Sequence, residues 1–364
     1  MSITFPKVNT HIHLPPNFSA FNTVAEAVDQ AYAEDVEILG ASNYYDFSVY
    51  DTFAELAKAK GIQPLFGMEI VCRIESLANA GVKINDPGNP GKMYICGKSL
   101  TQFAYPNPRA AELLSVIRCG DEARMASMVD LLAKVFEQSG IETGLDAEAI
   151  IKQVAHRFGV HQGTVVLQER HVAQAFQEAI FEHVALEERV AKMAELFQAA
   201  PKVDPVDGVG IQAEIRTHLM KAGKAAFVHE NFVTFEQAKE LITELGGIVC
   251  YPVLADGMNP KSGFEADPQT LVGYLKDLDI HAAEFIPNRN QASVVSEYAE
   301  VMSDAGFVLS AGTEHNTTER IPIMPQCKGD VAIPDEALRL FIEGAHHQVR
   351  HQKEIAGGHH PWNP

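Results

Sequence analysis

The fold is decided by residues 36–66, VEILGASNYYDFSVYDTFAELAKAKGIQPLF, in which two short apolar runs flank a helical pattern. The run Val36–Ala41 is too short and too continuously apolar for an amphipathic helix, so we expect a buried strand there. Residues 62–66 have the same character, and residues 50–60 between the two runs have helical spacing. Two buried strands joined by one helix predict a parallel βαβ unit.

The same alternation extends in both directions along the chain. Residues 3–8 and 21–32 predict a preceding strand and helix, and after Lys224 strand-like runs again alternate with helical patterns as far as FVLSAG (307–312). Between them, residues 108–223 show helical periodicity and no convincing strand. We therefore predict an α/β domain made of residues 1–104 plus 224–364, with a helical insertion or lid subdomain at residues 105–223.

The predicted insertion contains two apolar helical faces. The first comprises Met125, Met128, Val129, Leu132 and Phe136, and the second comprises Val172, Ala175, Phe176, Ile180 and Val184. Residues repeating at three- and four-residue intervals lie on one side of a helix, so both faces are expected to pack into a core.

Composition limits the possible functions. The chain has 364 residues, of which 46% are hydrophobic and 21% charged, as in ordinary globular proteins. Its formal net charge of −19 would repel a polyphosphate backbone, so we expect no nucleic-acid partner. A small-molecule anionic substrate is still compatible with this negative net charge, because a divalent cation can reverse the sign of the potential inside one pocket.

The sequence also indicates the surroundings in which the protein works. Five widely spaced cysteines without a CxxC pair are expected to be free thiols in a reducing compartment. Neither a signal-peptide pattern nor an apolar run of membrane-spanning length is present, so we expect a cytoplasmic protein with no membrane partner. The oligomeric state stays open, and a homo-oligomer is compatible with the sequence.

Candidate metal ligands follow three of the predicted strands. His11 and His13 close the first strand, where residues two apart point to the same side. Glu69 follows IQPLF, and Glu314 follows FVLSA. The carboxyl ends of barrel strands share one rim, so the four side chains can meet there. Two imidazoles and two carboxylates suit zinc, manganese or iron. Read alone, His-x-His could equally be two surface histidines of a loop.

Beyond these residues, the chain resembles the polymerase-and-histidinol-phosphatase (PHP) family of metal-dependent phosphoesterases, nearest its stand-alone branch that acts on small phosphate esters and nucleotides. The resemblance is nearly colinear from residue 6 to residue 320. It is carried by NTHIH (9–13), GIQPLFGMEI (61–70), ERHVAQA (169–175), GKAAFV (223–228), LGGIVCYPVLAD (245–256), AAEFIPN (282–288) and LSAGTEH (309–315). It implies a distorted (β/α)7 TIM-like barrel with an inserted helical subdomain.

The chain also departs from the family pattern at several metal positions. Asn43 and Tyr44 stand where the family usually carries an aspartate and a histidine, and Tyr94 and Tyr251 stand where it has histidines. A neutral phenol is a poor metal ligand, because it must lose a proton with a pKa of about 10. We therefore expect a degenerate ligand set that holds one divalent ion.

The remaining roles follow from side-chain chemistry. His315 or His171 could act as the general acid or base, because an imidazole titrates near neutral pH. Arg170 is the preferred anion clamp, with Lys224 and Arg289 as further candidates, although a solvated helix residue is an equally good interpretation of Arg170. Four side chains in the positions of the lost ligands complete the predicted substrate-binding set: Asn43, Tyr44, Tyr94 and Tyr251. These side chains could instead simply fill the cavity that the lost ligands leave.

Three functions are compatible with these features. The first is a metal-dependent hydrolase, most simply a phosphoesterase that uses a metal-activated water on a phosphorylated metabolite or nucleotide. The second is metal-assisted lyase or isomerase chemistry, or another hydrolysis, on a small polar substrate. The third is a catalytically silent binding protein. Retention of both histidines and both carboxylates argues against the third, because buried acids without a cation are costly.

Overall fold

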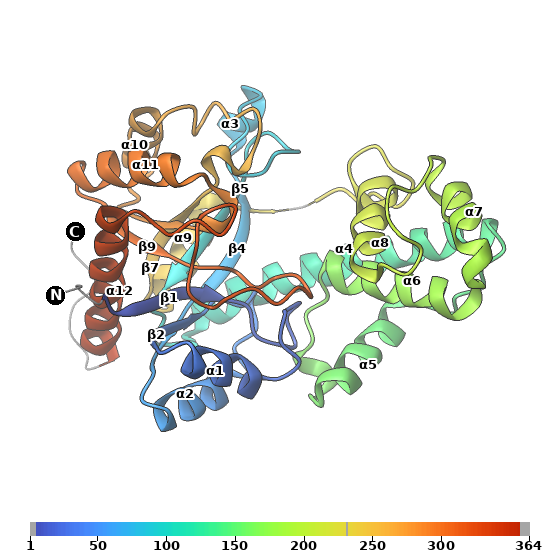
Figure 1. Cartoon of the computed structure of the whole chain (residues 1–364), viewed down its shortest axis with the longest axis horizontal. Helices are drawn as coiled ribbons and strands as arrows, with labels where there is room; N and C mark the ends of the chain where they lie inside the picture. The colour runs from blue at the N-terminus through green and yellow to red at the C-terminus, as the bar shows by residue number, and fades with distance from the viewer. Residues whose placement is uncertain (1–4, 231, 357–364) are drawn as a thin grey trace. The chain divides into compact units, whose positions relative to one another are not determined.

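The computed structural model describes residues 5–230 and 232–356, and the chain forms two compact units (Figure 1). The barrel unit, which we name after the barrel predicted from the sequence, comprises Met1–Pro15, Ser19–Ser115 and Phe232–Pro364, and the helical unit comprises Pro16–Phe18 and Val116–Asn231. The observed division after residue 115 lies eleven residues beyond the boundary predicted from the sequence, because the first helix of the insertion begins within the barrel unit.

The barrel unit contains two sheets of hydrogen-bonded strands. The first has the order β1-β2-β3 and is parallel, and the second has the order β6-β4-β5-β7-β8-β9. The strands are β1 (Lys7–Ile12), β2 (Val36–Ala41), β3 (Gln63–Phe66), β4 (Met68–Arg73), β5 (Lys92–Lys98), β6 (Val233–Thr234), β7 (Ile248–Val253), β8 (Ala282–Phe285) and β9 (Val308–Ala311).

One strand, β5, departs from the expectation of parallel strands. It runs antiparallel to both β4 and β7, whereas β7, β8 and β9 are parallel to one another. The connection from β4 to β5 contains only the five-residue helix α3 (Glu75–Asn79). Without a longer helix to cross over the sheet, the chain turns back at the same end, which produces an antiparallel pair.

Isolated bridges join the two sheets at the carboxyl ends of β1 and β2. Ile12 pairs with Glu314 beyond β9, and Tyr44 pairs with Glu69 at the start of β4. Within the described residues the ladders do not continue into a closed barrel. The bridges nevertheless bring together the segments after β1, β2 and β9 and the beginning of β4, which are the segments that carry the predicted ligands.

Helices of ordinary amphipathic character cover the strands. They are α1 (Val24–Ala33), α2 (Tyr50–Ala59), α9 (Phe235–Glu244), α10 (Pro268–Asp277), α11 (Ala292–Asp304) and α12 (Asp335–Ala356). The last of them packs on the beginnings of the first strands, where Val349 shares a core cluster with Val8 and Ile38. A Cβ atom on Gly344 would lie 1.7 Å from the Leu309 carbonyl oxygen, so only glycine allows α12 to approach β9 this closely.

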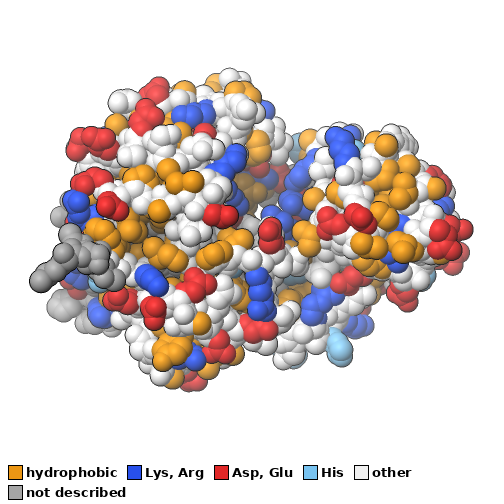
Figure 2. All heavy atoms as spheres, in the orientation of Figure 1, with side chains coloured by type: hydrophobic (Ala, Val, Ile, Leu, Met, Phe, Trp, Pro, Cys, Tyr) orange, Lys and Arg blue, Asp and Glu red, His pale blue; other side chains and the backbone are white. Residues whose placement is uncertain are grey.

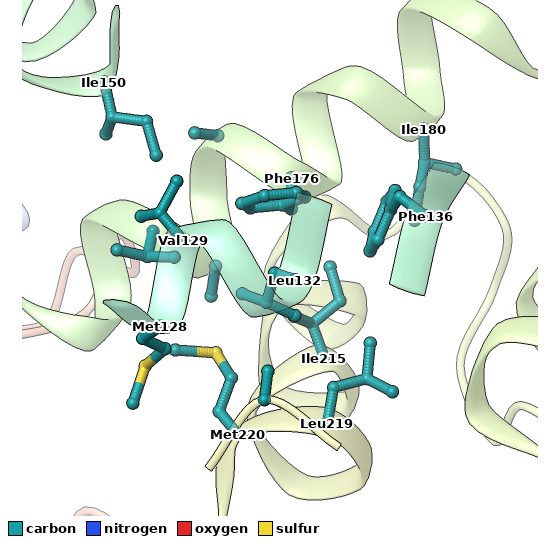
Figure 3. Packing of buried hydrophobic residues seen from close by; sticks show 14 of the residues in the cluster. Met128, Val129, Leu132, Phe136, Ile150, Phe176, Ile180, Ile215, Leu219 and Met220 are labelled. Carbon is teal, nitrogen blue, oxygen red and sulfur yellow. The ribbon is translucent and has the colours of Figure 1, made fainter. Parts of the chain in front are cut away.

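The helical unit has an apolar core. Its helices are α4 (Pro108–Gln138), whose first residues belong to the barrel unit, α5 (Ala147–Phe158), α6 (Glu169–His183), α7 (Leu186–Phe197) and α8 (Gly208–Ile215), followed by a π-helical turn at Arg216–Met220. Figure 3 shows side chains of α4, α6 and α8 converging. The Phe136 and Phe176 ring centroids are 4.8 Å apart. Both predicted apolar faces lie in this core, which confirms that part of the prediction.

The surface and the cysteines add two observations. On the face drawn in Figure 2, acidic and basic side chains are interspersed over both units. Among the described residues, no helix has the length and apolar character needed to cross a bilayer. All five cysteines are free thiols, as expected from their spacing.

Candidate metal centre

The centre is built on the alternation of side chains at the end of β1. Ile12 points into the apolar core that contains Leu14 and Phe21, so His11 and His13 on either side of it point the opposite way. Both imidazoles are buried. Glu69, the second residue of β4, is buried beside them.

The ligand atoms of these three residues converge. The Nε2 atoms of His11 and His13 are 3.4 Å apart, and Glu69 Oε2 lies 3.2 Å from His13 Nε2 and 4.0 Å from His11 Nε2. Tetrahedral ligands at a zinc distance of about 2.0–2.1 Å would be roughly 3.3–3.4 Å apart. The separations of 3.4 and 3.2 Å are therefore close to those that a single divalent ion requires, and the third, 4.0 Å, is wider.

Burial and protonation also fit a metal. Glu69 Oε2 is buried and has no hydrogen-bond donor, which is costly for a carboxylate unless a cation is present. Burial lowers the pKa of His13, which favours the neutral, coordinating form of this imidazole. The Tyr44 ring stacks on His13 with a centroid separation of 5.4 Å and restrains its orientation. Two imidazoles and one carboxylate thus form a donor set that suits zinc, manganese or iron.

Glu284 on β8 orients the first ligand. Its Oε2 lies 2.6 Å from His11 Nδ1, and its Oε1 accepts hydrogen bonds from Lys98 Nζ at 2.6 Å and Thr10 Oγ1 at 2.9 Å. Burial alone would raise the pKa of Glu284, but Lys98 and His11 lower it to about 2. The ionised carboxylate fixes the proton of His11 on Nδ1 and leaves Nε2 for coordination, as outer carboxylates commonly do in metal sites.

A second group of potential ligands overlaps this one. His11, Cys96 and Glu284 also have donor atoms within 4.8 Å of one another. Lys98 Nζ already contacts Glu284 Oε1 and lies 3.4 Å from His11 Nδ1. Burial raises the pKa of the Cys96 thiol well above its ordinary value, so this sulfur is protonated. We therefore interpret the second group as residues that position His11 for the first group, and not as a second metal site.

The backbone of Glu314 is hydrogen-bonded to the segment that carries His11 and His13, whereas its side chain contacts other residues. Its N–H donates to the His11 carbonyl at 2.9 Å, and its carbonyl accepts from the His13 N–H at 2.7 Å. Its Oε2 accepts hydrogen bonds from Arg289 Nη2 and, at 2.6 Å, from Asn316 Nδ2. Among the described residues, the ligand groups with atoms within 4.8 Å do not include Glu314. Its role as a fourth ligand stays a prediction.

The histidine predicted to be an acid or base in the barrel unit is engaged elsewhere. His315 Nδ1 lies 2.7 Å from Thr313 Oγ1, and Nε2 lies 3.0 Å from the Ile321 carbonyl oxygen. Its ring stacks on Phe21 at a centroid separation of 5.0 Å. Both ring nitrogens thus stabilise the segment after β9.

Asn43 and the three tyrosines, predicted to bind substrate, lie in different surroundings. Asn43 exchanges two hydrogen bonds with the Leu14 backbone, at 2.8 and 2.9 Å, and so fixes the turn after β1. Tyr251 is buried and donates to Glu265 Oε1 at 2.8 Å. Tyr94 lies on β5, where its N–H donates to Asn85 Oδ1 at 2.9 Å. The Tyr44 ring stacks on His13, a member of the ligand group, and the Asn43 carbonyl accepts the Glu69 N–H at 3.2 Å.

Arg170 and His171 belong to α6 in the helical unit. His171 Nδ1 accepts the Gln168 N–H at 3.2 Å and so caps the helix, and burial lowers the pKa of this imidazole to about 3. The Arg170 guanidinium lies 5.9 Å from the centroid of the Phe18 ring. The observed environment of His171 favours a neutral capping residue.

The pairing of Lys98 with Glu284 beside His11 was not predicted from the sequence. Lys98 ends the run MYICGK, and Glu284 lies inside the run AAEF. A charge inside an otherwise buried strand is a signal that a buried partner exists, because an unpaired one would be too costly. Nothing in the local sequence indicates which partner, since the two residues are 186 positions apart.

Comparison with known proteins adds a structural likeness. No family model matches the chain, and no curated protein matches its sequence. A protein from Bifidobacterium adolescentis, described as a metal-dependent phosphoesterase, is similar with a TM-score of 0.61 at 12% identity over 94% of this chain and 97% of that one. An amidohydrolase from Chromobacterium violaceum, solved with sulfate and no metal, is similar with a TM-score of 0.56 at 14% identity, over 88% of this chain and 93% of that one. The likeness shows a shared fold across both units.

Proposed function

We propose that this chain is a metal-dependent hydrolase of the PHP type, with that family's distorted barrel, and that it cleaves a small phosphate ester. The single observation that carries the proposal is the convergence of His11 Nε2, His13 Nε2 and Glu69 Oε2 on one point. A divalent ion held there would supply Lewis acidity and a bound water of lowered pKa. The fold shared with proteins described as a phosphoesterase and an amidohydrolase supports hydrolysis.

The charges around the centre favour an anionic substrate. Lys98 neutralises Glu284, and Arg289 neutralises Glu314, so Glu69 is the one remaining charge among these five residues. A divalent ion would then leave the centre with a net positive charge in a strongly acidic protein. Such a local field attracts a phosphoryl group and disfavours a cationic substrate.

Two side chains of the barrel unit would handle that substrate. The Arg289 side chain is 40% exposed beside buried Glu314, so its guanidinium can donate further hydrogen bonds to a phosphate. Burial raises the pKa of Tyr44 well above 10. This phenol therefore stays protonated at neutral pH, where it can donate a hydrogen bond to a substrate oxygen.

The test combines a metal count with a substrate panel. Elemental analysis of the purified protein should give about one divalent ion per chain, because one set of ligands converges. Phosphomonoesters, cyclic phosphodiesters and nucleotides, assayed with manganese or zinc, should show turnover that a chelator removes. A matched panel of N-acyl amino acids and cyclic amides distinguishes amide hydrolysis.

Each outcome has a defined meaning. Turnover in the phosphate panel alone supports the proposal. Turnover of amides alone would replace it with amidohydrolase chemistry, and metal binding without turnover in either panel would favour the lyase or isomerase alternative. Protein that binds no divalent ion would rule out the metal-dependent mechanism.

A further inference from the structure

Lys98 occupies an unusual position for a lysine. It is the last residue of β5, and only 2% of its side chain is exposed. Lysine is almost never fully buried unless its charge is paired, because removal of an ammonium group from water is expensive. Nothing in the proposed reaction uses this residue directly.

The surroundings of Lys98 satisfy its ammonium group. Nζ donates to Glu284 Oε1 at 2.6 Å, to the Thr10 carbonyl at 3.2 Å and to Ser42 Oγ at 3.3 Å. An ammonium has three donors, and each finds an acceptor here. The three acceptors come from β8, from β1 and from the residue after β2, so Lys98 ties three strands together behind the metal centre.

The two carboxylate oxygens of Glu284 contact different partners. Oε1 receives both Lys98 Nζ and Thr10 Oγ1, whereas Oε2 receives only His11 Nδ1. Two donors on one oxygen fix the rotation of the carboxylate. The other oxygen is thereby presented to the imidazole as an acceptor.

We infer that Lys98 is a positioning residue for the metal centre: by holding Glu284 Oε1, it presents Oε2 to His11 and keeps Nε2 of His11 directed at the ion. This inference rests on the metal-binding part of the proposed function. It does not depend on which bond the enzyme hydrolyses.

The first experiment measures metal affinity after removal of the ammonium. Lys98→Met should weaken zinc binding about 10- to 100-fold, the usual effect of losing an outer-shell partner, in competition with a fluorescent zinc chelator. Lys92→Met is the matched control, because Lys92 is also buried on β5 but pairs with Asp86. Its zinc affinity should stay within about threefold of wild type.

The second experiment distinguishes positioning from general support. In Glu284→Gln, Lys98 and Thr10 should draw the amide oxygen to the Oε1 position, which turns the NH2 group toward His11 Nδ1. His11 must then accept on Nδ1 and carry its proton on Nε2, so zinc binding should fall further than in Lys98→Met. In the double variant Lys98→Met/Glu284→Gln, Thr10 Oγ1 can instead donate to the Ala311 carbonyl, 3.2 Å away. The amide oxygen is then free to face His11.

The double variant should therefore bind zinc at least about tenfold more tightly than Glu284→Gln alone, because a harmful substitution is relieved by a second one. Nitrogen-15 spectra of labelled histidines should show the His11 proton on Nδ1 in the wild type and on Nε2 in Glu284→Gln. Equal or weaker zinc binding by the double variant would overturn the inference, as would an unchanged affinity in Lys98→Met. Wild-type protein without zinc affinity would instead defeat the proposed function itself.

Discussion

The buried centre of the barrel unit and the apolar core of the helical unit contain different kinds of side chain. The centre of the barrel unit holds ionisable groups that are almost completely removed from water, among them Lys98, Glu284 and Glu69. The core of the helical unit is formed by aliphatic, aromatic and methionine side chains around Phe136 and Phe176 (Figure 3). Burial of ionisable groups lowers the stability of a fold unless their charges are paired, whereas burial of apolar side chains stabilises it.

The largest effect should come from the apolar core. Phe176→Ala removes a fully buried ring that packs on Phe136, and it should destabilise the helical unit by about 3–5 kcal/mol. Hydrogen exchange of peptides from α4 to α8 measures this loss. Leu186→Ala, on a side chain that is 49% exposed, is the control and should change stability by less than about 0.5 kcal/mol. Equal loss in both variants would contradict the assigned core.

Glu69→Gln should weaken metal binding strongly without lowering the stability of the metal-free protein. Loss of a direct ligand should weaken metal binding by more than about 100-fold, or about 3 kcal/mol, since outer-shell groups alone contribute 10- to 100-fold. The metal-free protein should melt at the same or a higher temperature, because Glu69 Oε2 is a buried oxygen without a donor. Glu75→Gln, at an exposed position just beyond β4, should change neither property. A large drop in the melting temperature of metal-free Glu69→Gln would show that this carboxylate stabilises the fold.

The helical unit also contains a charged cluster around Glu169. Glu169 is contacted by Arg124 at 2.5 Å, Lys221 at 3.0 Å and Arg216 at 3.6 Å. Burial opposes ionisation of Glu169, but these three cations lower its pKa to about 2. Because the folded-state pKa lies below the ordinary value, the carboxylate stabilises the folded protein above about pH 4.5, and this contribution is lost as the pH falls toward 2.

Glu169→Gln should therefore lower the free energy of unfolding by about 2–3 kcal/mol at pH 7, and the difference from wild type should shrink toward zero near pH 2. Denaturant titrations at several pH values measure this difference. Glu148→Gln, in an exposed pair with Lys152, should behave like wild type throughout. A difference that is independent of pH would mean that the charge of Glu169 is not the stabilising property.

The comparison also explains what could be predicted from the sequence. Periodicity located the helical faces around Met128 and Phe176, because a core of this kind is specified by local spacing. The alternation of His11 and His13 about Ile12 was likewise readable, and the structure brings Glu69 to both histidines. These features depend on short stretches of chain or on a shared rim of parallel strands.

The remaining features depend on contacts between distant residues. Lys98 and Glu284 are 186 positions apart, yet their side chains form a buried ion pair beside His11. Glu314 lies beyond the end of β9, and its carboxylate accepts a hydrogen bond from Arg289, 25 positions earlier in the chain. The antiparallel direction of β5 follows from the path of its connection rather than from its own residues. A local pattern can indicate that a buried charge has a partner, but it does not identify that partner.

The packing of α12 has a consequence for synthesis on the ribosome. His11 is translated 273 residues before Glu284, an interval of roughly 14–55 s at about 5–20 residues per second. The helix that covers the beginnings of β1 and β2 emerges later still. During that interval the nascent chain carries His11 without its partner Glu284, so the proposed metal centre can form only late in translation, and prematurely terminated chains would lack it.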